Sequence, residues 1–207
     1  AVPAEDVEAL AELAGTAVRL PPMPKEAGQP RLRAAPAAAA DLPEPAGGRW
    51  HEADWNAPIF VDSMSGGHEL FPGGGFGQLL RAIGLWNGPS ALRLLPGVLR
   101  GPRCFGNAEA ADGRISISYD DPCGEIADTS PTLAVGGAYY STADVRIVNG
   151  ASYWKITKGM VVLDNAYTKF AGLSTGCYED VLAHEIGHAV GLAHATSSPA
   201  LMAPWLA

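Results

Sequence analysis

The sequence predicts an α+β domain with a mixed sheet, and two observations lead to that fold class. Short segments rich in β-branched and other apolar residues recur between residues 57 and 164, and one helical segment interrupts them. A second helical segment follows the last of these strands, near the C-terminus. Strands interleaved with one helix and followed by another are typical of α+β domains, in which helices cover one face of a sheet.

The expected elements follow one another in a simple order. A first strand is expected at 57–62, a glycine-rich loop at 66–77 and a helix at 76–88. Further strands are expected at 91–95, 114–119, 132–141, 144–149 and 159–164. The last helix should start near Tyr178, because Glu179 and Asp180 would then place negative charge in its first turn, where it suits the helix dipole.

Residues 1–48 differ in composition from the rest of the chain. They hold 14 Ala and eight of the 17 Pro and no Phe, Trp or Tyr, so they cannot bury much apolar surface. A short helix is expected at 5–18, followed by a Pro/Ala linker. We therefore expect a largely disordered leader or a pro-segment over 1–48, and one folded domain over 49–207.

The charge balance bears on the partners of this protein. The formal net charge is −8 and the sequence pI is about 5.0, with only 14 Lys and Arg residues. Nucleic acids and anionic membrane surfaces attract clustered positive charge, so neither is an expected partner. No apolar run approaches the roughly 20 residues that would span a bilayer.

The segment from His184 to His194 reads HEIGHAVGLAH and holds three of the five histidines. On a helix His184 and His188 would project from the same face and bind one metal ion, while Glu185 would reach a water molecule on that metal. A continued helix would carry His194 about 9 Å beyond His188, which is too far to share the ion. The chain must turn back, and Gly191 stands where that turn is needed. These spacings predict a zinc site with His184, His188 and His194 as ligands.

The pattern HExxHxxGxxH resembles that of the metzincin zinc endopeptidases, and among them most closely the matrixins. In matrixins a methionine turn follows the third histidine, and Met202 and Pro204 in the segment ALMAP match it. Segments 76–95 and 111–121 resemble the first helix and early strands of the family. The resemblance implies a mostly parallel twisted sheet, a first helix, an active-site helix ending at a glycine turn, and a methionine turn. Because the chain ends at Ala207, before the family's last helix, we expect a domain truncated at its C-terminus.

The same resemblance implies a function, which is a secreted, monomeric endopeptidase with one catalytic zinc. It would cleave proteins through a zinc-bound water that Glu185 activates, with Met202 as the base of the site and Pro204 and Trp205 beside the substrate pocket. The rival interpretations are a catalytically silent protein-binding module on the same fold and a zinc amidase acting on small molecules. Calcium is a further expected ion by resemblance, with candidate ligands Asp120, Asp121, Asp164 and Asn165, although these residues also suit solvated turns.

Three cysteines allow one internal disulfide. Our preferred pair is Cys123 with Cys177, since both lie in polar, loop-like stretches. Cys104 occurs in the segment PRCFG, which is similar to the latency motif of matrixin pro-segments, but it follows the first helix inside the domain and is interpreted as a structural or free cysteine. Ser174 in GLSTG matches a serine-hydrolase pattern whose other requirements the chain does not meet.

Overall fold

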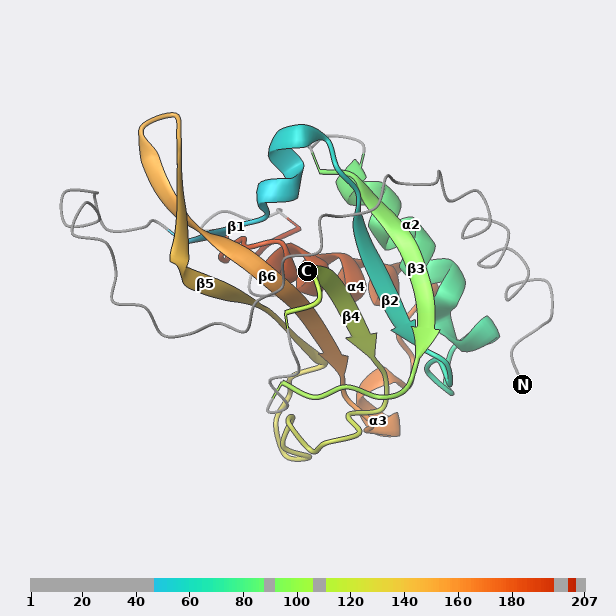
Figure 1. Cartoon of the computed structure of the whole chain (residues 1–207). Coiled ribbons are helices and arrows are strands. Elements are labelled where there is room, and N and C mark those ends of the chain that lie inside the picture. The colour runs from blue at the N-terminus through green and yellow to red at the C-terminus, as the bar shows by residue number, and fades with distance from the viewer. Residues whose placement is uncertain (1–46, 88–91, 106–110, 196–200, 204–207) are drawn as a thin grey trace.

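The computed structural model describes residues 47–87, 92–105, 111–195 and 201–203. A twisted six-stranded sheet forms its centre (Figure 1). Five strands follow the order β1-β6-β4-β2-β3, and the sixth strand, β5, also pairs with β6. All neighbouring strands are parallel except β5 and β6, so the predicted mixed, mostly parallel sheet is confirmed. The strands are β1 (Gly48–Arg49), β2 (Ile59–Met64), β3 (Leu94–Arg100), β4 (Arg114–Ser118), β5 (Ala134–Val148) and β6 (Ala151–Leu163).

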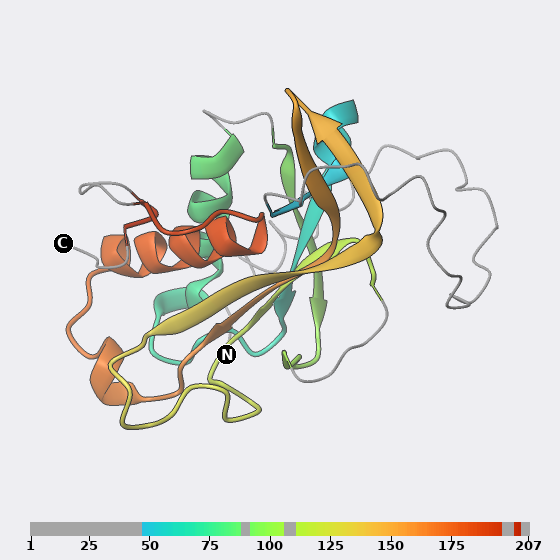
Figure 2. The same ribbon diagram turned by 90° about the vertical axis from the view of Figure 1, so that its left-hand side faces the viewer.

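Two helices, α2 (Phe76–Asn87) and α4 (Thr175–Ala189), pack on the same face of the sheet (Figure 2). The main core lies between these helices and the sheet, and Ile115, Leu182 and Ile186 are fully buried there. Shorter helices are the 3₁₀ turns η2 (His51–Trp55) and η3 (Pro72–Gly75) and the single turn α3 (Tyr167–Phe170). Among the described residues, no helix has both the length and the apolar character needed to cross a membrane.

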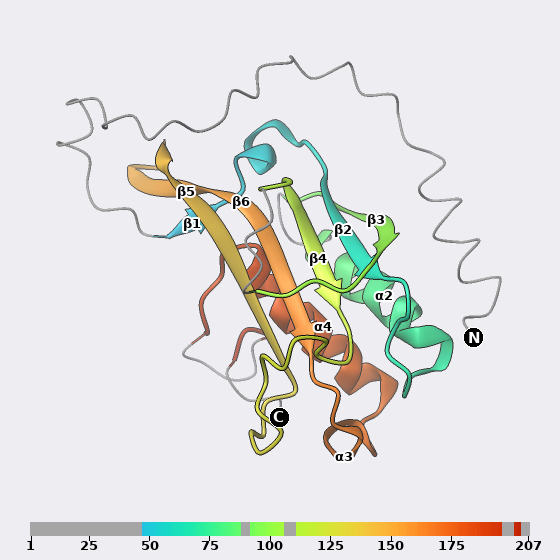
Figure 3. The same cartoon turned by 60° about the horizontal axis from the view of Figure 1, so that its bottom comes forward.

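Strand β5 is longer than predicted, because the expected strands at 132–141 and 144–149 form one strand. Its pairing with β6 shifts register between Ser141 and Val145 but resumes, so the polar residues in that stretch bulge without ending the strand. Asn149 and Gly150 then form a two-residue turn with φ of 51° and 84°, and β6 starts at Ala151. The resulting hairpin reaches beyond the other strands (Figures 1 and 3).

Helix α4 begins three residues before the predicted start at Tyr178. Ser174 is its N-cap, and the Ser174 hydroxyl accepts a hydrogen bond of 3.1 Å from the backbone N–H of Cys177. The first turn therefore contains no acidic residue, and the placement of Glu179 and Asp180 there was wrong. Side-chain capping, rather than charge at the helix end, decides where α4 starts.

The preferred disulfide was also wrong. Cys104 is bonded to Cys123, with Cα atoms 5.9 Å apart, and Cys177 is free and exposed. The physical reason is topological, since β3, β2 and β4 are parallel neighbours and the segments that follow β3 and β4 leave the same edge of the sheet. Cys104 and Cys123 lie in those two segments, whereas Cys177 lies in the first turn of α4.

Two indole rings anchor α4 to the rest of the domain. Trp50 donates its indole N–H to the Ala189 carbonyl at 3.1 Å, and Trp86 donates to the Ala183 carbonyl at 2.8 Å. Residues 1–46, with the predicted helix at 5–18, lie outside the described residues, so the division at residue 48 stays a prediction.

Candidate metal centre

Two imidazoles share one face of α4. His184 and His188 lie one turn apart, and their Nε2 atoms are 3.1 Å from each other. The His184 ring is buried, and the His188 ring is partly exposed toward the open side of the helix. The helical spacing predicted from the sequence therefore brings these two nitrogens to one point.

The third imidazole reaches that point because the chain reverses at Gly191. Gly191 has a φ of +100°, and its N–H and that of Leu192 close the helix on the carbonyls of His188 and Gly187 at 3.0 and 2.9 Å. A Cβ at Gly191 would lie 2.5 Å from the Gly48 carbonyl oxygen, so this turn also needs glycine for space. After the turn, His194 places its Nε2 3.1 Å from that of His188.

Backbone carbonyls select the tautomer of two of these rings. The Nδ1 atom of His184 lies 2.8 Å from the Leu201 carbonyl, and that of His188 lies 2.8 Å from the Leu192 carbonyl. Because a carbonyl oxygen only accepts, each Nδ1 carries the proton, and each Nε2 presents a lone pair. The close Nε2 atoms of His184 and His188 therefore share no proton, and a cation between them would remove their mutual repulsion.

The donor set fits a zinc ion. The three histidines offer ligand atoms that all lie within 4.8 Å of one another. Tetrahedral coordination with Zn–N bonds of 2.0 to 2.1 Å places nitrogens about 3.3 Å apart, close to the 3.1 Å seen for two of the three pairs. Burial lowers the pKa of His188 below its usual value, which favours the neutral imidazole that binds a metal.

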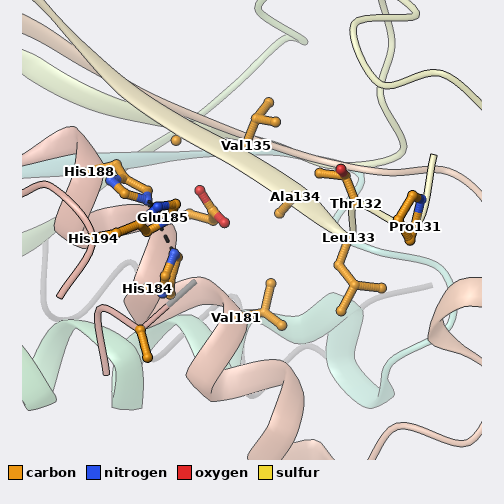
Figure 4. Close-up of a pocket in the computed structure, with 12 residues that line it drawn as sticks. Pro131, Thr132, Leu133, Ala134, Val135, Val181, His184, Glu185, His188 and His194 are labelled. Carbon is orange, nitrogen blue, oxygen red and sulfur yellow. Dashed lines mark hydrogen bonds between the residues drawn. The ribbon is translucent and has the colours of Figure 1, made fainter. Parts of the chain in front are cut away.

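Glu185 follows the first histidine and points its carboxylate into the space beside the three rings (Figure 4). It lies outside the histidine cluster, whose ligand atoms are all imidazole nitrogens. Burial raises the pKa of the Glu185 carboxyl to about 8, and a hydrogen bond from the Gly136 N–H partly offsets that rise. A carboxyl group with such a pKa is suited to accept and return a proton near neutral pH.

Gly136 is a residue that sequence analysis did not single out. It lies on β5, and a Cβ at this position would overlap the backbone carbonyl group of Glu185. Glycine therefore allows β5 to lie directly against α4 at the residue that follows His184 in the chain. The pair Gly136-Gly137 inside a strand pattern was the available signal, because glycine within a strand often marks a close approach of another backbone.

Met202 packs against α4 at Gly187, and its role as the base of the site stays a prediction. It is buried, and a Cβ at Gly187 would overlap its sulfur atom, so the small residue between His184 and His188 makes room for it. The Met202 carbonyl accepts a hydrogen bond of 2.6 Å from the Ala195 N–H. The segment 201–203 is thus tied to the chain on both sides of the third histidine.

Comparisons with known proteins give one family match and matches to solved structures. Residues 108–207, slightly less than half of the chain, match the model of the matrixin family. This part of the chain, which carries the three histidines, is similar to the matrixins. Among solved structures, the chain is similar to high choriolytic enzyme 1, a hatching enzyme zinc-protease from the medaka fish Oryzias latipes, with 17% identity and a TM-score of 0.35. The match covers 70% of this chain and 50% of that one. No curated protein matches the chain.

A pocket of about 560 Å³ opens beside the three histidines (Figure 4). Val181, His184, Glu185 and His188 of α4 line one side of it, together with His194 beyond the end of the helix. The opposite side is formed by residues 131–136, which include the start of β5. Apolar side chains such as Leu133, Val181 and Ala203 face the pocket, so it suits an apolar group next to the metal centre.

Two groups of predicted site residues remain, namely the pocket residues after Met202 and the candidate calcium ligands. Pro204 and Trp205 lie outside the described residues, so their place beside the pocket stays a prediction. The calcium prediction gains no support, because among the described residues only the three histidines form a metal-binding group of this kind. The carboxylate of Asp121 accepts backbone N–H bonds from Glu125 and Ile126, and that of Asp164 is paired with Lys169.

Proposed function

We propose that this protein is a zinc-dependent endopeptidase that hydrolyses peptide bonds of proteins. The observation that carries the proposal is that three imidazole nitrogens lie close together beside the partly buried Glu185, which is not part of that group. Backbone carbonyls set the tautomer of two of the rings. The match to the matrixin family supports the same class of reaction. When bound, zinc supplies a Lewis acid for the substrate carbonyl and lowers the pKa of water to about 7.

Residues of the chain itself supply proton transfer and substrate binding. The Glu185 carboxylate takes a proton from the attacking water and returns it to the nitrogen of the leaving amine, so one water is consumed and one peptide bond is broken. The backbone of β5 borders the pocket and, among the described strands, is paired only with β6. Its other edge offers hydrogen bonds to an extended substrate. The apolar pocket receives the side chain that follows the cleaved bond.

The cellular setting is part of the proposal. We infer a secreted protein, since a disulfide between Cys104 and Cys123 forms and persists in an oxidising compartment. We also propose that the protein is a monomer. The net charge of −8 supports protein or peptide substrates rather than nucleic acid partners. Residues 1–48 are proposed as a leader or pro-segment that precedes the peptidase domain.

Glu185→Ala tests the proposal most directly. The variant should keep its zinc and its melting temperature, because Glu185 is not a ligand, while cleavage of a denatured protein should fall by roughly 100- to 10,000-fold. Asp180→Ala removes an exposed carboxylate from the same helix and should leave activity unchanged.

The wild-type protein should lose activity in a chelator and regain it when zinc is restored. His188→Ala should lose most of the bound zinc, which elemental analysis measures directly. A wild-type protein that holds zinc but cleaves no protein would favour the silent binding module, and hydrolysis limited to small amides would favour the amidase. Equal cleavage by wild type and Glu185→Ala would overturn the proposed mechanism.

A further inference from the structure

The far end of the pocket is held by a lysine whose role the reaction does not explain. Figure 4 shows Pro131, Thr132 and Leu133 on the side of the pocket opposite the three histidines. We call residues 127–133 the rim of the pocket. Behind the rim lies Lys169 of α3, whose side chain is only 12% exposed. A buried ammonium needs several oxygen partners, so its surroundings show what it holds together.

Three oxygen atoms surround the Lys169 ammonium. It is paired with the carboxylate of Asp164, which is fully buried, and it donates to the carbonyls of Thr132 and Ala127 at 3.3 and 3.5 Å. An ammonium has three donors, and each has one oxygen here. A carboxylate with two backbone carbonyls is also the kind of oxygen set that binds a hard cation. The Lys169 ammonium therefore supplies the positive charge that these three oxygens need.

The three oxygens come from two segments that meet at the rim. Ala127 begins a turn that the Ser130 N–H closes by bonding the Ala127 carbonyl at 2.8 Å, and Thr132 follows two residues after that turn. Asp164 follows β6, and its backbone N–H binds the Leu133 carbonyl at 2.9 Å. Without the ammonium, the buried Asp164 carboxylate would lack its counter-charge, and the carbonyls of Ala127 and Thr132 would lose the donor that they share.

We propose that Lys169 is a positioning residue that fixes the rim formed by residues 127–133 and so sets how tightly an extended substrate binds at the far end of the pocket. The proposal rests on the proposed peptidase function, because it assigns the rim to substrate binding. Lys169 touches neither the reacting atoms nor the histidines, so its effect should fall on binding more than on the chemical step.

Lys169→Met tests this role, since methionine keeps an apolar stem and removes the charge. For a peptide that continues several residues beyond the cleaved bond, we expect KM to rise by about tenfold, the change produced by roughly 1.4 kcal/mol, with kcat within about twofold of the wild type. A peptide that ends directly after the side chain in the pocket should be affected much less. Lys169→Arg should restore most of the binding, and Lys155→Met, which removes an ion pair to Glu52 at the surface, is the matched control.

A second measurement does not depend on activity. Amide hydrogen exchange over 127–133 should speed up in Lys169→Met and stay near the wild-type rate in Lys155→Met. Unchanged exchange in Lys169→Met would overturn the positioning role, and faster exchange with an unchanged KM would overturn its link to substrate binding. A wild-type protein without chelator-sensitive cleavage would instead overturn the proposed function, and the exchange rates would still decide whether Lys169 holds the rim.

Discussion

Small residues on and beside α4 set the distances on which the candidate metal centre depends. Gly187 lies between His184 and His188, and the sulfur of Met202 occupies the space that a Cβ would need there. The contact between Gly187 and Met202 joins the helix to the segment that follows the third histidine.

Gly187→Ala tests this contact at the level of one methyl group. In an open helix the change would stabilise the protein by about 1 kcal/mol, because alanine is the better helix former. Here we expect a loss of roughly 1 to 3 kcal/mol from overpacking against Met202, together with weaker zinc binding. Urea unfolding and zinc titration measure the two effects.

Met202→Leu is the companion variant for that experiment. It conserves volume and removes no ligand, so zinc should remain bound and the free energy of unfolding should fall by less than about 1.5 kcal/mol. Complete loss of zinc in Met202→Leu would mean that Met202 does more than pack. A gain of stability in Gly187→Ala would show that the sulfur has room to move.

At the scale of elements, the local parts of the site were predictable and the long-range parts were not. All three histidines and Gly191 fall within eleven residues, so helical periodicity and one turn describe their arrangement. Gly136 lies against Glu185, and Lys169 contacts Ala127 and Thr132, which are all distant in the sequence, so helical or strand periodicity does not record these contacts. The mostly parallel sheet was anticipated through the resemblance to the metzincins, whereas the disulfide partner of Cys123 was not predicted.

The predicted bounds of helices and strands are also accurate only where a regular local pattern determines them. The helix at 76–87 and the strand at 114–118 lie close to their predicted ranges because their apolar patterns are regular. Strand β6 starts eight residues before the predicted strand at 159, since its early part pairs through a hairpin turn at Asn149-Gly150 that the apolar pattern does not show. The pair Asn149-Gly150 is the sequence signal for this hairpin, because Asn-Gly favours a two-residue turn.

The contact between β5 and α4 leads to a prediction at this scale. Gly136→Ala should force the strand away from Glu185, because the new Cβ would overlap backbone that cannot rotate aside. We expect kcat/KM to fall by at least about tenfold, since a displacement near 1 Å in an active site can cost about 100-fold. Zinc content should be unchanged, because no ligand lies on β5.

Gly137→Ala is the matched control for Gly136→Ala. Its Cβ would lie 3.2 Å from the edge of the Phe105 ring, a side chain that can shift, and not against α4. Steady-state kinetics and elemental analysis of both variants measure the difference. Similar losses of activity in the two would indicate a general sensitivity of β5 rather than a specific contact at Glu185.

At the scale of the whole molecule, the pocket beside the histidines depends on a loop region behind β5. The segment from 101 to 105 reaches the outer side of β5, where the Tyr139 hydroxyl donates to the Phe105 carbonyl and the Phe105 ring lies over Gly137. The disulfide between Cys104 and Cys123 ties this segment to the loop after β4. The wall of the pocket is therefore supported from the side that does not face the substrate.

The last prediction concerns that disulfide. Replacing Cys104 and Cys123 together by serine should lower the free energy of unfolding by about 3 kcal/mol, the chain-entropy estimate for a loop closed over a separation of 19 residues. Cys177→Ser should leave stability nearly unchanged, because Cys177 is exposed and unbonded. Peptide mapping under non-reducing conditions identifies the bonded pair, and urea unfolding gives the energies. A bond from Cys123 to Cys177 would reverse the order of the two effects, making Cys177→Ser the costly change and leaving Cys104 without influence on stability.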